Sequence, residues 1–512
     1  MTIEKSLTVA LFSVALLLAG CGGEKAATDD KVFTYGTMAY GVAMENTGLD
    51  PHKSYSGWSC IRYGVGETLF KFNDKMELVP WLAESYEQID EFTVKIKIND
   101  NAHFSNGKQV TGESVKKCLD DLVARHDRAP FDLKVYSVTA DGQYVTVRST
   151  EKMPALLNAL SDPYGCIVDI DEGENNGIVI GTGPYKAVKV TDTEIELVKN
   201  DNYWGKTKPK MNKIVVKSIT DGDTLTMALQ KGEIDAAQGL PYASIALFKD
   251  NADYKISQVE TSRVYQMAFN FKNEDLKDIR VRKAISMAID KENFAKNLLN
   301  GNGTAAIGPF PANLPFGGDK VKDMPFDIEG AKKLLAEAGY ADTNGDGYVD
   351  KNGKNLTLRY LTYTSRMELP ILAEYSEAAL KNIGVKLDVN ATDNYKAFLK
   401  KGEYDIFAKA IVTAPTGDPE YYFNGHILGG APDNAGFYDS EVIMELLSKL
   451  HNTYGADNRA NLGIKLSQRV LDDAALFYAS HLRMSLVMKK GVEGFAAHPS
   501  DYYEITANLD KK

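Results

Sequence analysis

Segments with the two-residue period of a strand alternate with segments of helical period along the whole chain, and this alternation limits the fold more than any other feature. Within residues 92–98 every second side chain is apolar, which is the period of a strand with one buried face. Similar short strands are predicted at 144–147, 194–198 and 214–217. From residue 279 to residue 299 the apolar residues follow the spacing of an amphipathic helix or helix pair. Strands mixed with helices throughout predict an α/β protein.

Several later helices have recognisable ends. Asp327 is a predicted N-cap and Gly339 a predicted left-handed C-cap around the helical segment 331–338. A helix over about 368–382 should end before Gly384 and lead into a strand at 385–389. Two more helices are predicted near 441–452 and 459–471.

The composition and net charge of the chain indicate a large folded protein and limit the molecules that it can bind. The chain has 512 residues, of which 44% are hydrophobic, so it can bury a large core, and its length suggests two to four domains. A net charge of -11 repels polyanions and argues against a nucleic-acid partner.

The first thirty residues predict export. An apolar run over residues 7–18 has the length of a secretory signal but falls short of the roughly 20 residues that cross a bilayer. Leu18-Ala19-Gly20-Cys21 resembles the lipobox of bacterial lipoproteins, which implies a signal peptide over 1–20 and an acylated Cys21 as membrane anchor. Residues 21–31 are then a small, polar tether. The alternative is an ordinary cleaved signal with an incidental cysteine.

The other cysteines, Cys60, Cys118 and Cys166, are widely spaced and odd in number, so no disulfide framework is predicted. Either one pair is bonded or all three are buried thiols. The chain lacks the spacing CxxC, which argues against a cysteine-based zinc site.

Sequence signatures of catalysis are missing. The chain contains no GxSxG, HExxH or GxxxxGK[ST], and no GxGxxG that opens a helix. Its seven histidines never fall at metal-ligand spacing on one helix. We therefore expect a binding protein and no enzyme, with a hydrolase built from scattered residues as the alternative.

One short segment has the start of a calcium loop. Residues 342–347 match D-x-[DN]-x-[DN]-G, with glycine where the loop turns sharply. The candidate ligands are Asp342, Asn344, Asp346, Tyr348 and Asp350. The twelfth position, normally a bidentate glutamate, is Gly353, so the loop is incomplete. The alternative is a hairpin rich in Asx turns with Asn352-Gly353 as its second bend. Any calcium here would be structural.

Many segments, in order, resemble the family 5 solute-binding proteins of bacterial ABC importers, which capture peptides and nickel chelates. The resemblance covers nearly the whole mature chain. The matching segments are Leu49-Asp-Pro-His52, Gly66-Glu-Thr-Leu-Phe70, Val79-Pro-Trp-Leu-Ala-Glu-Ser-Tyr86, Phe104-Ser-Asn-Gly107, Gly181-Thr-Gly-Pro-Tyr185, Asn202-Tyr-Trp-Gly205, Gly232-Glu-Ile-Asp235, Arg282-Lys-Ala-Ile-Ser-Met-Ala-Ile289 and Gly417-Asp-Pro419.

The resemblance implies the large, type II periplasmic-binding-protein fold, in which two hinged lobes enclose the ligand. Lobe I would comprise residues 32–265 and 484–512, with an extra subdomain at about 72–185, and lobe II residues 266–483. It also implies a monomeric receptor on the extracytoplasmic face of the cell membrane, working with an ABC permease and ATPase. No cofactor is required.

The implied ligand is a nickel or other metal chelate, with a di- or oligopeptide as the alternative. Peptide-binding members hold the peptide ammonium with an aspartate shortly before the Asp-Pro pair, and residues 411–417 contain none. The nickel-chelate subgroup instead uses arginine and aromatic side chains, which suit planar carboxylates and chelator surfaces.

The resemblance also implies individual site residues. Arg128 and Phe131 match the arginine and aromatic positions of the nickel subgroup, but Pro163-Tyr164-Gly165-Cys166 stands where a second arginine is expected. The other implied ligand contacts are Tyr55, Trp58 and Ser59 in the loop 52–62, Asp418 of the Asp-Pro pair, and Tyr421, for which a core position is the alternative.

Two more residues have implied roles that depend on the ligand. His426 occupies a place comparable to that of a histidine that reaches the metal in nickel members, with a solvent-facing loop histidine as the alternative. Arg366 would hold the peptide carboxylate in a peptide-binding protein; a solvated arginine before the helix at 368 is the alternative.

Overall fold

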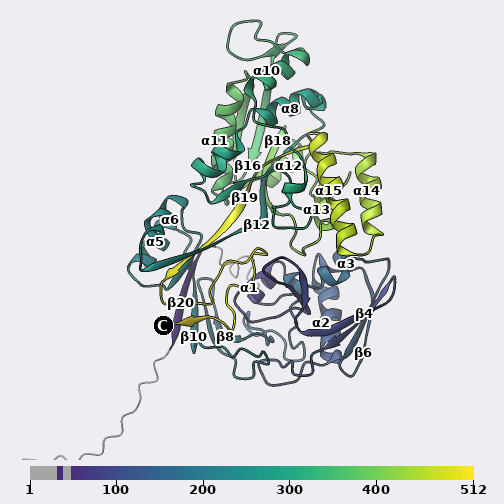
Figure 1. Ribbon diagram of the computed structural model, residues 1–512, viewed down its shortest axis with the longest axis vertical. Helices are drawn as coiled ribbons and strands as arrows, with labels where there is room; N and C mark the ends of the chain where they lie inside the picture. The colour runs from purple at the N-terminus through teal and green to yellow at the C-terminus, as the bar shows by residue number, and fades with distance from the viewer. Residues whose placement is uncertain (1–30, 39–47) are drawn as a thin grey trace, which may run out of the picture. The chain divides into compact units, whose positions relative to one another are not determined.

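One long mixed sheet organises the fold in the computed structural model, which describes residues 31–38 and 48–512 (Figure 1). The predicted signal peptide, Cys21 and residues 21–30 of the predicted tether lie outside the described residues. In spatial order the strands of the long sheet are β17 (Lys386–Ala391), β16 (Thr357–Thr362), β18 (Ile406–Val412), β12 (Tyr254–Phe269), β19 (Leu476–Lys489), β11 (Ala236–Gln238), β1 (Val32–Thr37), β10 (Lys213–Ser218), β9 (Glu194–Lys199) and β8 (Tyr185–Val190), and β13 (Gly303–Ala305) pairs with β19.

Two strands, β12 and β19, are much longer than the rest and pair with each other in antiparallel fashion. At one end β19 pairs with β11, and at the other end β12 pairs with β18. The ladder between them shifts register between Glu260 and Val264, and again between Tyr265 and Gln266. Such bulges bend a strand and increase its twist, so the sheet changes direction here.

A smaller antiparallel sheet forms within the first third of the chain. It runs β4 (Ala83–Asp90), β5 (Thr93–Ile98), β7 (Tyr144–Ser149) and β6 (Val135–Asp141), and α2 (Gly112–Arg125) contacts β6 and β7. The three two-stranded pieces are β2 (Phe70–Phe72) with β3 (Leu78–Pro80), β14 (Asp350–Lys351) with β15 (Lys354–Asn355), and β20 (Val492–Glu493) with β21 (Asp510–Lys511).

Helices account for most of the remaining regular structure. They are α1 (Ser56–Arg62), α3 (Ala129–Leu133), α4 (Leu156–Ala159), α5 (Gly222–Gln230), α6 (Tyr242–Lys249), α7 (Glu274–Lys277), α8 (Ile279–Met287), α9 (Lys291–Asn293), α10 (Ile328–Glu337), α11 (Glu368–Lys381), α12 (Tyr395–Lys401), α13 (Glu420–His426), α14 (Glu441–His451) and α15 (Ala456–Asp472), with short 3-10 or π turns η2 (Pro163–Gly165), η3 (Phe294–Leu298) and η4 (Gly318–Lys320).

The local signals read from the sequence are confirmed where they were strongest. Asp327 caps α10 by accepting from the Gly330 backbone N–H, and Gly339 has a left-handed φ of 90°. Asn352 and Gly353 have φ angles of 55° and 71° in the hairpin between β14 and β15, as a tight two-residue turn requires. The segment predicted as a helix or helix pair divides into α8, α9 and η3.

Three groups of buried side chains form the main cores. The first draws on residues between Phe33 and Ala236 together with Met484 to Leu509, and the second on residues between Tyr265 and Ala479. The third draws on residues between Val264 and Tyr478 together with Phe72 and Met76. Both ends of the described chain therefore contribute to the first core, whereas the second is built from one continuous stretch. Among the described residues, no helix has the combination of length and apolar character that crossing a bilayer needs.

Candidate functional site

The Arg128 guanidinium lies between two tyrosine rings. Its central carbon is 5.3 Å from the centroid of Tyr55 and 5.2 Å from that of Tyr164. Tyr55 immediately precedes α1, Arg128 precedes α3, and Tyr164 lies in η2, so three separate segments build this stack. Aromatic faces attract a cation, and they hold the planar guanidinium in one orientation.

Two carboxylates lie near Arg128, but they do not occupy all of its N–H donors. The Arg128 Nη2 lies 3.4 Å from an Asp162 carboxylate oxygen, and Nη1 lies 3.8 Å from one of Asp132. Both distances are long for charge-assisted hydrogen bonds. Burial raises the pKa of Asp132 to about 6, although the Arg128 charge opposes the rise. Burial disfavours the charge on Arg128, but attraction from Asp162 keeps its pKa above the ordinary value. Arg128 is thus a permanent cation with N–H donors still available.

Tyr421 joins this group from a distant part of the chain. It lies at the start of α13, and burial raises its pKa while the nearby Arg128 charge opposes the rise. Two hydrogen bonds position the preceding loop against the first core: Asn158 donates to the Thr416 carbonyl at 2.8 Å, and the Tyr502 hydroxyl donates to the Pro415 carbonyl at 3.1 Å. We call Tyr55, Arg128, Tyr164 and Tyr421 the arginine–tyrosine cluster.

Trp58 and Ser59 lie on α1, directly after Tyr55. The Trp58 ring packs edge-on against Tyr502 with centroids 4.9 Å apart, and Arg62 lies 5.9 Å from the Trp58 centroid. The Trp58 Nε1 is buried without a hydrogen-bond partner among the described residues. A buried N–H donor without a partner costs free energy, so this indole is a candidate donor to a bound molecule. Ser59 is buried within α1.

Arg366 belongs to a second basic group. Burial, followed by the charge of nearby Arg366, lowers the pKa of Arg263, which also reaches Asp501 at 3.5 Å. Arg366 precedes α11, whose Glu368 accepts a hydrogen bond from Tyr242. Asp501 also pairs with Arg62 at 3.3 Å, so this carboxylate does not fully compensate the charges of Arg263 and Arg366, which favours an anion as a further partner.

His426 is half-buried and paired with a lysine. Its Nδ1 lies 3.0 Å from the Lys409 Nζ, and its ring stacks on Tyr422 with centroids 5.7 Å apart. Burial, followed by the Lys409 charge, lowers the pKa of His426 to about 2, so the imidazole is neutral. When Lys409 donates to Nδ1, the ring hydrogen must be on Nε2. Metal binding through Nε2 would therefore require Lys409 to release this hydrogen bond.

Phe131 and Asp418 lie outside the arginine–tyrosine cluster. Phe131 is 67% exposed, and Lys134 lies 4.2 Å from its ring centroid. Both Asp418 oxygens accept from Arg459 at 2.7 Å, so this carboxylate is committed to the packing of α15. We leave both residues out of the proposed ligand set.

The acidic loop at 342–350 is held together by its own hydrogen bonds. Asp342 accepts from the backbone N–H groups of Gly345 and Gly347, and Asp346 accepts from that of Tyr348. Asp350 accepts from the backbone and hydroxyl of Thr343. This is the arrangement expected of the Asx-turn alternative; calcium binding at Asp342, Asn344, Asp346, Tyr348 and Asp350 stays a prediction.

The three described cysteines, Cys60, Cys118 and Cys166, are free and buried. Burial raises the pKa of the Cys118 thiol to about 12. The sequence left open either one disulfide-bonded pair or three buried thiols, and the structure has three buried thiols.

Several side chains at these sites were not predicted from the sequence. Tyr164 occupies the segment where a second arginine was expected, and it stacks on the first arginine instead. Asp162, Arg263 and Lys409 were not anticipated, because no motif or spacing relates them to the residues they contact.

The family model for bacterial extracellular solute-binding proteins, family 5 (middle), matches residues 77–432. The chain therefore belongs to this family of solute-binding proteins, and its mixed α/β architecture is the two-lobed, type II periplasmic-binding fold.

Individual relatives cover nearly the whole chain. It is 27% identical over 504 residues to the nickel-binding protein NikA of Staphylococcus aureus, with 97% of each chain covered. It is 25% identical to the oligopeptide-binding protein AppA of Bacillus subtilis, with 97% of this chain and 96% of the relative covered. The crystal structure of S. aureus NikA in complex with Ni(L-His)2 superposes with a TM-score of 0.78 at 24% identity, covering 94% of this chain and all of that one.

Proposed function

We propose that this protein is the receptor of an ABC importer and that its ligand is a small metal chelate, with nickel as the first candidate. The observation that carries this proposal is Arg128 held between Tyr55 and Tyr164 with Tyr421 alongside. A guanidinium with free donors binds a chelator carboxylate, and the flanking rings pack on its apolar parts. The nickel-binding name of the S. aureus relative supports the same choice.

A peptide ligand is the second candidate, and one observation favours it. The charge of nearby Arg366 contributes to the lowered pKa of Arg263, so the carboxylate of a peptide would relieve a repulsion already present. Against this candidate, residues 411–417 contain no aspartate that could pair with a peptide ammonium.

We further propose lobe I as residues 32–265 with 484–512, and lobe II as 266–483. The division of buried side chains between the first core and the second core supports these boundaries, whereas the third core packs Phe72 and Met76 against residues of lobe II. The extra subdomain at about 72–185 would contain the four-stranded sheet β4–β5–β7–β6.

The placement in the cell is part of the proposal. Acylation of Cys21 would anchor the protein, as a monomer, on the outer face of the cell membrane, where it would pass its ligand to a permease and ATPase. Several acyl chains on one residue give stable attachment where a single chain does not. The lipobox-like sequence Leu18-Ala19-Gly20-Cys21 supports the anchor.

Isothermal titration calorimetry of the chain starting at Gly22 with Ni²⁺ plus L-histidine tests the identity of the ligand. We expect saturable binding that Ni²⁺ alone does not reproduce, and at least tenfold weaker binding in Arg128→Ala, because losing one charged hydrogen bond costs about 1.5–3 kcal/mol. Arg148→Ala is the matched control, since Arg148 is half-exposed and pairs with Asp90 at 3.6 Å.

Other outcomes would decide against the chelate. If Ni²⁺ with L-histidine gives no heat while a mixture of short peptides binds, and Arg366→Ala rather than Arg128→Ala removes that binding, the ligand is a peptide. Equal binding by Arg128→Ala and the unsubstituted protein would remove the arginine–tyrosine cluster from the site.

A further inference from the structure

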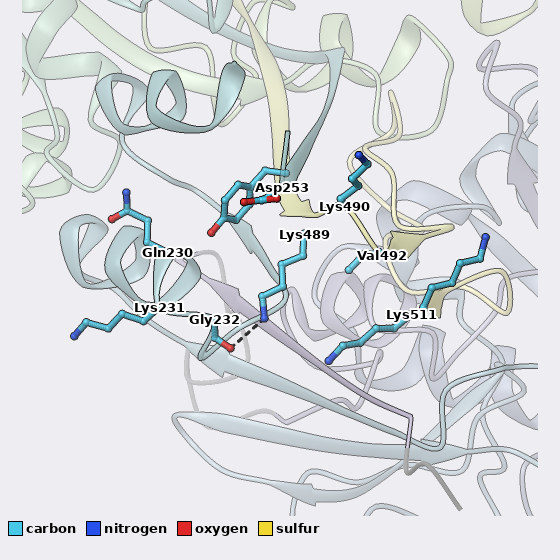
Figure 2. A pocket seen from close by; sticks show the side chains of 11 residues that line it. Gln230, Lys231, Gly232, Asp253, Lys489, Lys490, Val492 and Lys511 are labelled. Atoms are coloured by element: carbon cyan, nitrogen blue, oxygen red, sulfur yellow. Dashed lines mark hydrogen bonds between the residues drawn. The ribbon is translucent and has the colours of Figure 1, made fainter. Parts of the chain in front are cut away.

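A basic pocket of about 360 Å³ lies where four segments meet, and none of its lining residues belongs to the arginine–tyrosine cluster. These segments are the end of α5 with the following turn, the start of β12, the end of β19 with the following turn, and residues 511–512. Five of the lining residues are lysines: Lys231, Lys489, Lys490, Lys511 and Lys512. Figure 2 shows Lys231, Lys489, Lys490 and Lys511 around this pocket; Lys489 and Lys490 are neighbours at the end of β19, and the other two come from separate segments.

Acidic groups compensate only part of this charge. Lys489 and Lys511 share one carboxylate, that of Asp235, at 3.1 Å and 2.9 Å, and Lys489 also donates to the Gly232 carbonyl at 3.1 Å (Figure 2). Lys512 pairs with Glu493 at 2.7 Å. Among the described residues that line the pocket, Asp253 alone has an acidic side chain.

Two of the lysines have no acidic partner. Lys231 and Lys490 are exposed, and neither side chain has a hydrogen bond or ion pair within residues 31–38 and 48–512. The pocket therefore presents a net positive charge on a chain whose total charge is -11. Such a local surplus attracts anions that the rest of the surface repels.

The pocket lies next to the point where residues 1–30 join the described structure. The Lys511 Nζ lies 3.1 Å from the carbonyl oxygen of Val32, the first residue of β1. Lys31 pairs with Asp510 at 2.7 Å, and Lys210 with the same carboxyl group at 3.4 Å. Since Cys21 is ten residues before Lys31, a fully extended tether spans about 35 Å at most.

We propose that this basic pocket docks on the headgroups of anionic phospholipids in the membrane that carries the anchor. The proposal rests on the lipid anchor of the proposed function, because the tether keeps this surface within reach of the bilayer. Exposed charges interact within about 8 Å at physiological salt, so lysines beside the tether are well placed to orient the receptor and lysines elsewhere are not.

Vesicle co-sedimentation of the soluble chain starting at Gly22 tests the docking surface without the anchor. Residues 31–512 form one compact unit, so this chain keeps the whole fold. We expect binding to phosphatidylcholine vesicles that contain phosphatidylglycerol, at least tenfold less binding to pure phosphatidylcholine, and release at high salt. The double variant Lys231→Glu, Lys490→Glu should lose at least tenfold in binding to the anionic vesicles.

The control variant reverses two lysine charges on a different element. Lys332 and Lys333 lie on α10, and Lys332→Glu with Lys333→Glu produces the same change in net charge. We expect this variant to bind anionic vesicles as the unsubstituted chain does. Equal loss in both variants would mean that net charge alone governs binding and would overturn the proposal.

Two further results would also overturn it. Equal binding to neutral and anionic vesicles would exclude recognition of charge. Saturable binding of inorganic phosphate that depends on Lys231 and Lys490, without binding to anionic vesicles, would assign the pocket to a free anion. The anchor is tested separately, by whether Cys21→Ser releases the full chain from washed membranes, so the two failures can be told apart.

Discussion

The Lys409–His426 pair shows how one partly buried contact links the pH of the medium to stability. Burial lowers the pKa of Lys409 to about 8, whereas a lysine in an unfolded chain titrates near 10.4. Below pH 8 Lys409 is protonated in both the folded and the unfolded protein, and the folded protein carries the full cost of burying this charge. Between pH 8 and about 10.4 the folded state loses the proton first, so stability from this group rises with pH.

Lys409→Met removes that dependence. We expect the variant to gain stability relative to the unsubstituted protein at pH 7, and the gain to shrink by about 1–2 kcal/mol by pH 9.5. Urea unfolding of both proteins at the two pH values measures the difference. A gain that is the same at both pH values would contradict a lowered pKa for Lys409.

At this scale the sequence named individual candidate residues but not the side chains that they contact. Tyr55, Arg128 and Tyr421 were predicted by resemblance to a family, and the structure brings these three together. Tyr164 and Lys409 were missed, because an aromatic residue or a lysine has no local signal that identifies its partner across the fold. Such partners are set by packing between segments far apart in sequence.

Among the helices, α13, α14 and α15 are joined by a single buried guanidinium. Arg459 on α15 donates to Asp418 and Glu420 at 2.7 Å each, and also to the carbonyls of Leu450 and Thr453. His451 at the end of α14 pairs with Glu420 at 2.7 Å, and this hydrogen bond raises the pKa of His451. The network therefore fixes the loop before Tyr421 as well as the helices.

Arg459→Ala should destabilise the protein by about 3–5 kcal/mol, because two buried carboxylates lose their partner. Arg469→Ala, on the exposed side of the same helix, removes a pair with Asp473 at 2.7 Å and should cost at most about 1 kcal/mol. Chemical unfolding of the two variants gives the comparison. Similar losses in both would show that the buried network adds nothing beyond a surface pair.

Element boundaries were predicted best where a local rule determines them. Asp327 and the Asn352-Gly353 turn follow from backbone chemistry within a few residues, and both were predicted. The length of β12 and β19 and their register shifts were not, because a strand of this length is defined by the pairing of residues more than 200 positions apart.

At the scale of the whole molecule, ligand binding and folding stability are coupled by mass action. A ligand that binds only the folded protein stabilises it by about 2.7 kcal/mol at a concentration one hundred times its Kd. Ni²⁺ with L-histidine should therefore raise the Tm in a concentration-dependent way, and Arg128→Ala should need at least tenfold more ligand for the same shift. Differential scanning calorimetry measures both. If the Tm of the unsubstituted protein does not change when the ligand is added, this result would contradict the chelate proposal.

The arrangement of β1 and the C-terminal segment also constrains how the chain can be made. β1 pairs with β10 and β11, β11 pairs with β19, and Lys31 pairs with Asp510, 479 positions away. Because β1 completes its surroundings only with β19 and the segment that contains Asp510, the first core cannot finish folding until these segments have been synthesised. The second core has all its residues earlier, so it can form first, and completing the first core requires contacts between residues 479 positions apart.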